Sequence, residues 1–145
     1  MLDRTIAGLI EGQDLLRLSG DTKVREAARQ MSARHVGAIL VHDADKDCGV
    51  FTERDMLDRV VAGGLPPDET VLREVMTPDP AFVGPEDTVR AAIFAMKRQR
   101  SRHLLVKDRG EIFAIVSVRD LLRSVVEESA ENQQVLDDLW EGFPV

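Results

Sequence analysis

Apolar and polar positions along the chain follow first a helical and then a strand period, and the same series occurs twice. A short apolar stretch at residues 15–18 precedes a turn, and residues 24–31 place apolar side chains on one stripe at helical spacing. Two apolar strands follow at residues 38–42 and 48–52, on either side of a polar turn. A second helix is expected to begin near Glu53. The pattern predicts the order β-α-β-β-α for the first half.

The second half repeats this pattern at a constant offset of 65 residues. Without a gap, 12 of 41 positions are identical between residues 21–61 and residues 86–126. The second copy places strands at residues 103–107 and 112–117, and its last helix starts near Val118. One such unit is too small to bury its own apolar faces well. We therefore predict an α/β fold in which two pseudo-symmetric repeats pack as one module.

The boundaries of the repeats follow from the connector and the flanking segments. We place the first repeat at residues 10–64 and the second at residues 73–128. The connector between them is rich in glycine and proline, and Thr70 is expected to cap a short helix over residues 71–76.

Two amphipathic segments flank the repeats. An N-terminal turn or helix carries Leu2, Ile6, Leu9 and Ile10. A C-terminal extension at residues 129–145 has an apolar face that we expect to be covered, either by a second copy or by its own chain. That face comprises Val135, Leu136, Leu139, Trp140 and Phe143.

Composition limits which partners and which cellular location we expect. The net charge of −7 argues against nucleic acid or an anionic membrane as the main partner. Cys48 is the only cysteine, so no intrachain disulfide is available. The sequence shows neither the apolar core of a signal peptide nor an apolar run long enough to cross a bilayer. We expect a cytoplasmic protein.

The strongest chemical signal lies where each repeat passes from its last strand into its second helix. Thr52, Arg54 and Asp55 stand at this junction in the first repeat, and Ser117, Arg119 and Asp120 stand there in the second. A helix N-terminus and an arginine suit a phosphate, and a carboxylate can accept from both hydroxyls of a ribose. The junctions therefore suit a ribose-phosphate ligand.

A purely structural interpretation of the same residues stays open. Thr52-x-x-Asp55 and Ser117-x-x-Asp120 also match a helix capping box, in which hydroxyl and carboxylate serve the helix alone. The retention of Arg beside Asp in both repeats, while neighbouring positions diverged, favours a ligand.

Other chemistry is not supported by the sequence. Asp43-x-Asp45-x-Asp47 begins like a calcium loop but lacks the glycine and glutamate that such a loop needs. The three histidines show no metal-ligand spacing, and no nucleophile or phosphate-loop motif occurs. We expect neither a metal site nor an enzyme.

The chain resembles a tandem pair of cystathionine-β-synthase (CBS) domains, a Bateman module of the stand-alone bacterial type. The resemblance covers roughly residues 10–128. It rests on Gly-Val-Phe-Thr-Glu-Arg-Asp at 49–55, Ile-Val-Ser-Val-Arg-Asp at 115–120 and Val-Met-Thr-Pro at 75–78, with the segments at 34–41 and 102–106.

What the resemblance implies is a regulatory module that binds an adenosine-containing ligand in clefts between the repeats: AMP, ADP, ATP, S-adenosylmethionine or a ligand of the NAD type. Such a ligand would be an effector rather than a required cofactor, and its binding would be transmitted to a partner protein. Thr52 and Asp55 would hold phosphate and ribose, and Val75, Met76, Thr77 and Pro78 would line the adenine slot. Basic residues would surround the phosphates: Arg34, His35, Arg100, Arg102 and His103. Modules of this kind usually pair, so we expect a homodimer.

The two predicted sites are not equivalent. No counterpart of Met-Thr-Pro precedes the first repeat, and Ala114 stands where the first repeat has Gly49. The Thr52/Asp55 site is therefore expected to bind more tightly than the Ser117/Asp120 site. The alternative function is a ligand-free dimerisation or protein-interaction module, in which both hydroxyl-carboxylate pairs are caps only.

Overall fold

The computed structural model describes residues 3–128 and residue 141 of the chain. These residues form two compact units. The middle unit comprises residues 15–80, and the split unit combines the described parts of residues 1–14 and 81–145. Each unit has its own mixed sheet and its own helices, which confirms the α/β class and the two repeats.

The middle unit has one four-stranded sheet, in the order β1-β2-β3-β4. The strands are β1 (Arg17–Ser19), β2 (Ala38–Asp43), β3 (Lys46–Thr52) and β4 (Thr77–Pro78). Strand β1 runs parallel to β2, and the other neighbours are antiparallel. The helices are α1 (Val24–Arg34), α2 (Glu53–Asp55), the π-helical segment η2 (Met56–Val61) and α3 (Leu72–Val75). Their apolar sides and the sheet bury one core, which includes Val24, Ala27, Met31, Ile39, Phe51, Val60 and Leu72.

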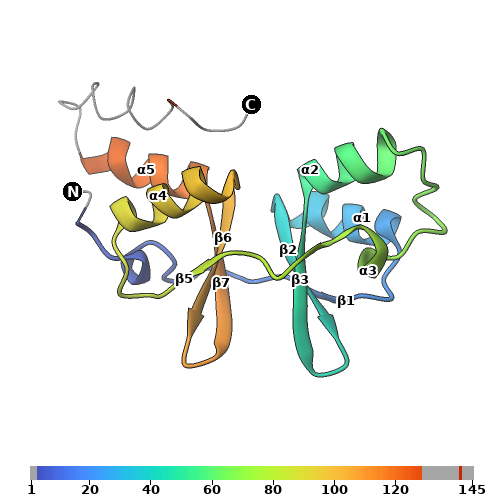
Figure 1. The fold of residues 1–145 in the computed structure, drawn as a ribbon, viewed down its shortest axis with the longest axis horizontal. Coiled ribbons are helices and arrows are strands. Elements are labelled where there is room, and N and C mark those ends of the chain that lie inside the picture. The colour runs from blue at the N-terminus through green and yellow to red at the C-terminus, as the bar shows by residue number, and fades with distance from the viewer. Residues whose placement is uncertain (1–2, 129–140, 142–145) are drawn as a thin grey trace. The chain divides into compact units, whose positions relative to one another are not determined.

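The split unit has a three-stranded sheet, in the order β5-β6-β7. Its elements are η1 (Ile6–Gly8), β5 (Phe82–Val83), α4 (Val89–Gln99), β6 (His103–Asp108), β7 (Glu111–Ser117) and α5 (Val118–Glu128). In Figure 1, helices α4 and α5 lie next to each other on one side of β6 and β7. Their core repeats the middle unit's pattern and includes Val89, Ala92, Met96, Leu104, Val116, Leu121 and Val125.

The duplication extends to local backbone detail. Both hairpins have a register shift at the same point, after Val41 and after Val106. The C-cap of helix α1 is His35 and that of helix α4 is Arg100, and both are in the left-handed conformation, with φ of 55° and 51°. A non-glycine residue with positive φ is uncommon, so its occurrence at equivalent positions shows that the two backbones follow one plan.

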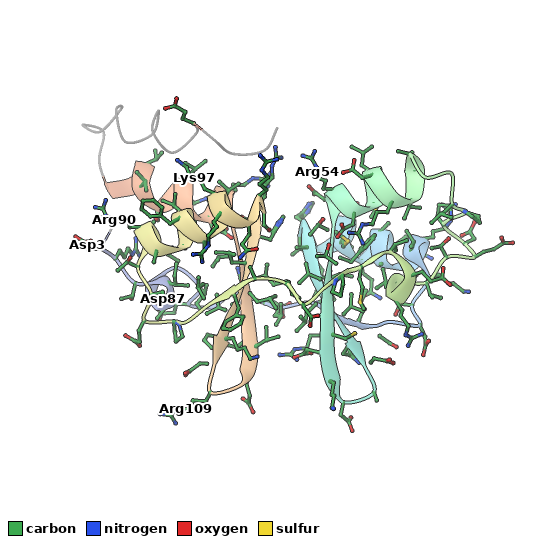
Figure 2. The ribbon with its side chains drawn as sticks, in the orientation of Figure 1. Asp3, Arg54, Asp87, Arg90, Lys97 and Arg109 are labelled. Atoms are coloured by element: carbon green, nitrogen blue, oxygen red, sulfur yellow. The ribbon has the colours of Figure 1, made fainter. Side chains whose placement is uncertain are left out.

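Each unit is completed by a segment from outside its β-α-β-β-α repeat. Ile6 of η1 is fully buried in the core of the split unit, and its N–H donates to the Asp87 carbonyl at 2.8 Å. Leu72 of α3 is fully buried in the middle unit, and its N–H donates to the Thr22 carbonyl at 2.9 Å. Near η1, Figure 2 shows Asp3 close to Arg90 of α4, an ion pair of 4.0 Å.

Most predicted elements are present, and some details differ. The helix expected over residues 71–76 covers Leu72–Val75, and its N-cap is Val71. The prediction that Thr70 caps it is wrong, because the Thr70 hydroxyl donates to the Pro66 carbonyl within the connector at 2.8 Å. The predicted apolar face of residues 135–143 lies outside the described residues. Within the described ranges, no helix is both long and apolar enough to cross a membrane.

Candidate functional site: two strand-to-helix junctions

The first junction connects β3 to α2 and is closed by a reciprocal pair of hydrogen bonds. The Asp55 N–H donates to Oγ1 of Thr52 at 3.1 Å, and the Thr52 N–H donates to Oδ2 of Asp55 at 3.0 Å. This is a complete capping box. The capping geometry expected for Thr52-x-x-Asp55 is therefore present, and a ligand role has to use the atoms that the cap leaves accessible.

The second junction, from β7 to α5, has the same arrangement. The Asp120 N–H donates to Oγ of Ser117 at 3.2 Å. Oδ2 of Asp120 accepts from both the N–H and the hydroxyl of Ser117, at 2.8 and 2.9 Å. Oδ1 of Asp120 makes no hydrogen bond with any described residue and remains able to accept one from a ligand. The second carboxylate thus keeps one oxygen that the cap does not use.

The first carboxylate is enclosed more completely. Asp55 is buried, with 8% of its surface exposed. The Thr77 hydroxyl on β4 donates to Oδ1 of Asp55 at 3.2 Å and lies 3.4 Å from Oδ2. Nε of Arg59 on η2 is 3.6 Å from Oδ1. Three predicted site residues, Thr52, Asp55 and Thr77, are therefore brought together, and Arg59 joins them.

Strand β4 comes close to β3 because Gly49 has no side chain. A Cβ placed on Gly49 would lie 2.6 Å from Sδ of Met76 and 2.7 Å from the Thr77 carbonyl oxygen. Sγ of Cys48 also lies 3.8 Å from Sδ of Met76. Burial, followed by the charge of Asp43, raises the pKa of the Cys48 thiol. Val75 is buried in the core, so only its backbone can line a site, while Pro78 is exposed.

The split unit has no counterpart of β4 among its described residues. There, Oε1 of Gln13 accepts from the Ile115 N–H at 3.1 Å. Ile115 corresponds to Val50, which pairs with Thr77 in the middle unit. A glutamine side chain therefore replaces a paired strand, and this explains why buried Ala114 is tolerated where the first repeat requires glycine.

The predicted basic residues divide between the two units. In the split unit, His103 pairs in register with Ser117, and the Arg102 carbonyl accepts from the Val118 N–H at 2.8 Å. Both residues therefore lie at the second junction, where Arg119 is exposed, and Arg100 ends helix α4. In the middle unit, the corresponding places beside Thr52 belong to Gly37 and Ala38, while Arg34 and His35 lie at the end of α1.

Arg54 does not join the group around Asp55. Its Nε pairs with Oδ2 of Asp58 on the same helix at 3.3 Å, and its side chain is half exposed. Figure 2 shows it projecting from the start of α2, away from β2 and β3.

The sequence analysis missed two residues of the site, Arg59 and Gln13, and it missed the structural role of Gly49. A difference between the repeats could have indicated Arg59 and Gly49. At the offset of 65 residues, Arg59 corresponds to Ser124 and Gly49 corresponds to Ala114. Among the described residues, no group of His, Cys, Asp and Glu could hold a metal ion.

The repeated sheet-and-helix unit and its junctions can be compared with known protein families. The model of the CBS domain matches residues 6–62 and again residues 72–127. The chain belongs to the CBS domain family. The two matches correspond to the two repeats and confirm the resemblance to a tandem CBS pair.

Curated relatives with CBS domains cover most of this chain. The CBS domain-containing protein CBSCBSPB3 of Arabidopsis thaliana is 34% identical over 131 residues, which is 88% of this chain and 24% of the relative. The mitochondrial CBS domain-containing protein CBSX3 of the same plant is 33% identical over 128 residues, or 84% of this chain and 62% of the relative. The chain thus spans about a quarter of CBSCBSPB3.

Solved structures of CBS proteins have the same fold. A candidate signal-transduction protein with CBS domains from Burkholderia ambifaria has a TM-score of 0.83 and 27% identity, covering 90% of this chain and 99% of its own. The CBS domain protein PAE2072 of Pyrobaculum aerophilum, solved as a complex with AMP, has a TM-score of 0.74 and 25% identity. That alignment covers 94% of this chain and 98% of the other.

Proposed function

We propose that this CBS pair is a non-catalytic regulator that binds an adenosine-containing ligand at its strand-to-helix junctions and transmits the bound state to a partner protein. The proposal rests on the hydrogen bond from the Thr77 hydroxyl to Asp55. This bond places a carboxylate that can bind hydroxyl groups beside β4, the strand formed by the last two residues of the Val-Met-Thr-Pro motif. The AMP complex of PAE2072, a relative with the same fold, supports an adenine nucleotide as the ligand.

The chemistry of the middle unit suits the nucleoside part of such a ligand. The Thr77 hydroxyl is already a donor to Asp55, so a ribose hydroxyl in its place would keep the same hydrogen bond. The partly buried thioether of Met76 offers a polarisable surface to an aromatic base. Pro78, beside it, is exposed and has no N–H that would need a partner.

The chemistry of the split unit suits a phosphate better. Helix α5 is eleven residues long, and its N-terminus carries the positive end of the helix dipole. Arg119, Arg102 and His103 add positive or ionisable groups beside Ser117. Arg119 can offer two parallel N–H donors to phosphate oxygens.

The test is a calorimetric titration of the purified protein with AMP, ADP, ATP, S-adenosylmethionine and NAD. Asp55→Ala and Asp120→Ala form a matched pair, because both remove a capping carboxylate from a helix start. Losing a charge-assisted contact to ribose should cost about 1.5–3 kcal/mol of binding free energy, roughly a tenfold to 150-fold loss of affinity. We expect Asp55→Ala to lose more than Asp120→Ala.

Urea unfolding of both variants supplies the control for the cap. If affinity stays at the wild-type level while the free energy of unfolding falls, the carboxylates serve the helices alone and the ligand-free alternative holds. Equal losses, or a larger loss for Asp120→Ala, would contradict the ranking of the two sites.

We also propose that two copies of the chain pair in solution through the helical face of the middle unit. Leu57 and Val61, four residues apart on the helix after β3, are 60% and 66% exposed. Val61 lines a groove of about 570 Å³, together with other apolar side chains of α1 and η2 that include Val24, Ala28, Met56 and Val60. Light scattering should give the mass of a dimer, and Val61→Glu should shift it towards that of a monomer. A wild-type monomer would contradict the proposal.

A further inference from the structure

The helix after β3 differs from its counterpart in the second repeat. Its residues 56–61 form π-helix, in which the Ala62 N–H donates to the Leu57 carbonyl five residues earlier, at 2.8 Å. Helix α5 runs as regular α-helix from Val118 to Glu128. A π-helical segment is rare and often lies at a functional site, because its wider turn changes the direction of the side chains that it carries.

Arg59 lies in this π-helical segment and contacts the end of α3. Its Nη1 donates to the Met76 carbonyl at 2.7 Å and lies 3.4 Å from the Val75 carbonyl. The last carbonyls of a helix have no partner within the helix, and an arginine commonly supplies one. Arg59 therefore holds the backbone immediately before β4.

The same guanidinium also reaches the proposed ribose-binding carboxylate. Its Nε is 3.6 Å from Oδ1 of Asp55, the oxygen that accepts from the Thr77 hydroxyl. One side chain thus joins the helix start, the end of α3 and, through Asp55, strand β4. All of these segments belong to the middle unit.

The second repeat has no such connection among the described residues. Ser124 stands at the position of Arg59, and its hydroxyl donates to the Leu121 carbonyl of its own helix at 2.9 Å. Its side chain is short and buried, and its hydrogen bond stays within its own helix. The contrast assigns the connection to Arg59 rather than to the fold that the repeats share.

We propose that Arg59 is the positioning residue of the first site: it holds residues 75–77 against Asp55 before any ligand arrives. Its effect on affinity rests on the proposed function, whereas its effect on the ligand-free protein does not. A pre-ordered segment does not have to lose conformational freedom on binding. Removing Arg59 should therefore weaken nucleotide binding by about threefold to tenfold, which is the range expected for ordering one or two residues.

The experiment compares Arg59→Met with Arg59→Lys and with Arg123→Met. Methionine keeps the length and helix propensity of arginine but removes its donors, whereas lysine keeps the charge and can reach a carbonyl. Arg123 is an exposed arginine of α5 next to Ser124 and serves as the matched control. Hydrogen exchange of the peptide covering residues 72–79 is measured without nucleotide, and AMP affinity is measured by calorimetry.

We expect exchange in residues 72–79 to rise several-fold in Arg59→Met, to rise less in Arg59→Lys and to be unchanged in Arg123→Met. AMP affinity should fall in the same order. Unchanged exchange in Arg59→Met overturns the proposal. Faster exchange with unchanged AMP affinity overturns the role in ligand binding and leaves Arg59 as a structural contact only.

Two controls distinguish a failure of the role of Arg59 from a failure of nucleotide binding or of folding. If wild-type protein binds no AMP, the proposed nucleotide function fails for this ligand, and the exchange measurement still decides whether Arg59 holds the segment. If Arg59→Met does not fold, as judged by circular dichroism, Arg59→Lys carries the test. In that case, the proposal that Arg59 holds residues 75–77 would be overturned if Arg59→Lys had a lower AMP affinity but the same hydrogen exchange in residues 72–79 as the wild type.

Discussion

The two strand-to-helix junctions share their capping geometry and differ in what lies over the carboxylate. Asp55 is covered by the Thr77 hydroxyl of β4 and lies beside Arg59, whereas Asp120 retains an oxygen without a described partner. The cap is a local requirement of a helix start, so it persisted in both copies. Contacts that come from distant segments were free to diverge, and the structural difference between the halves lies there.

Charge at the junctions diverged in the same way. At the offset of 65 residues between the repeats, acidic Glu53 corresponds to Val118, and Gly37 corresponds to basic Arg102. A Cβ placed on Gly37 would lie 3.2 Å from Cδ of Glu53, so a carboxylate occupies the space beside the first helix start. Under the proposed function, we therefore expect a phosphate to bind at the second junction rather than at the first.

The largest predicted effect tests what the halves have in common. Ile6→Ala and Leu72→Ala each truncate a fully buried side chain that enters its unit from outside the repeat. Each should lower the free energy of unfolding by about 2–5 kcal/mol, because a cavity is left in the core. Urea denaturation measures both, with Leu65→Ala, at 40% exposure, as a milder control. A negligible loss for Ile6→Ala would show that the split unit does not need η1.

The next largest predicted effect tests whether β4, which only the middle unit has among the described residues, excludes a side chain at Gly49. Gly49→Ala places a methyl group against Met76 and Thr77 and should cost about 1–3 kcal/mol of stability through overpacking. The reverse change at the matched position, Ala114→Gly, should cost only about 0.5–1 kcal/mol through backbone entropy. Urea denaturation of both variants checks the order. Equal losses would mean that the close approach of β4 is not what excludes a side chain at Gly49.

The smallest effect concerns Cys48, where the second repeat has Phe113. Burial and Asp43 raise the pKa of the thiol, which lowers its thiolate fraction at any given pH. Alkylation by iodoacetamide at pH 8 should therefore be several-fold slower in the native protein than in urea, with its rate profile displaced to higher pH. Asp43→Asn should recover part of the rate. Equal rates in native and unfolded protein would contradict the shift.

The order of elements was predictable from the sequence because local patterns determine it. Strands β2 and β3 and the starts of both second helices fall where periodicity and capping residues placed them. The middle unit's extra strand was not foreseen, since Thr77 and Pro78 show no strand period and pair only because Gly49 admits them. Thr70 was misread for a similar reason, since its hydroxyl found a nearer acceptor in the connector.

The candidate site was predictable only in part. Thr52 and Asp55 follow from a motif within four residues, and Thr77 followed from the family resemblance. Neither a local motif nor the family resemblance indicated Arg59. Its contact with Met76 depends on a π-helical turn that no residue pattern predicted. Comparing the repeats for positions that disagree, rather than agree, would have indicated it.

The burial of Ile6 beneath helix α4 also has a consequence for synthesis on the ribosome. Domains generally fold as units while the chain emerges, beginning from the N-terminus. Here residues 15–80 contain all the residues of their own core, whereas Ile6 belongs to a core that includes residues as late as Val125. Ile6 therefore emerges before residues 15–80 but is buried after them, and until then its apolar side chain is available to chaperones.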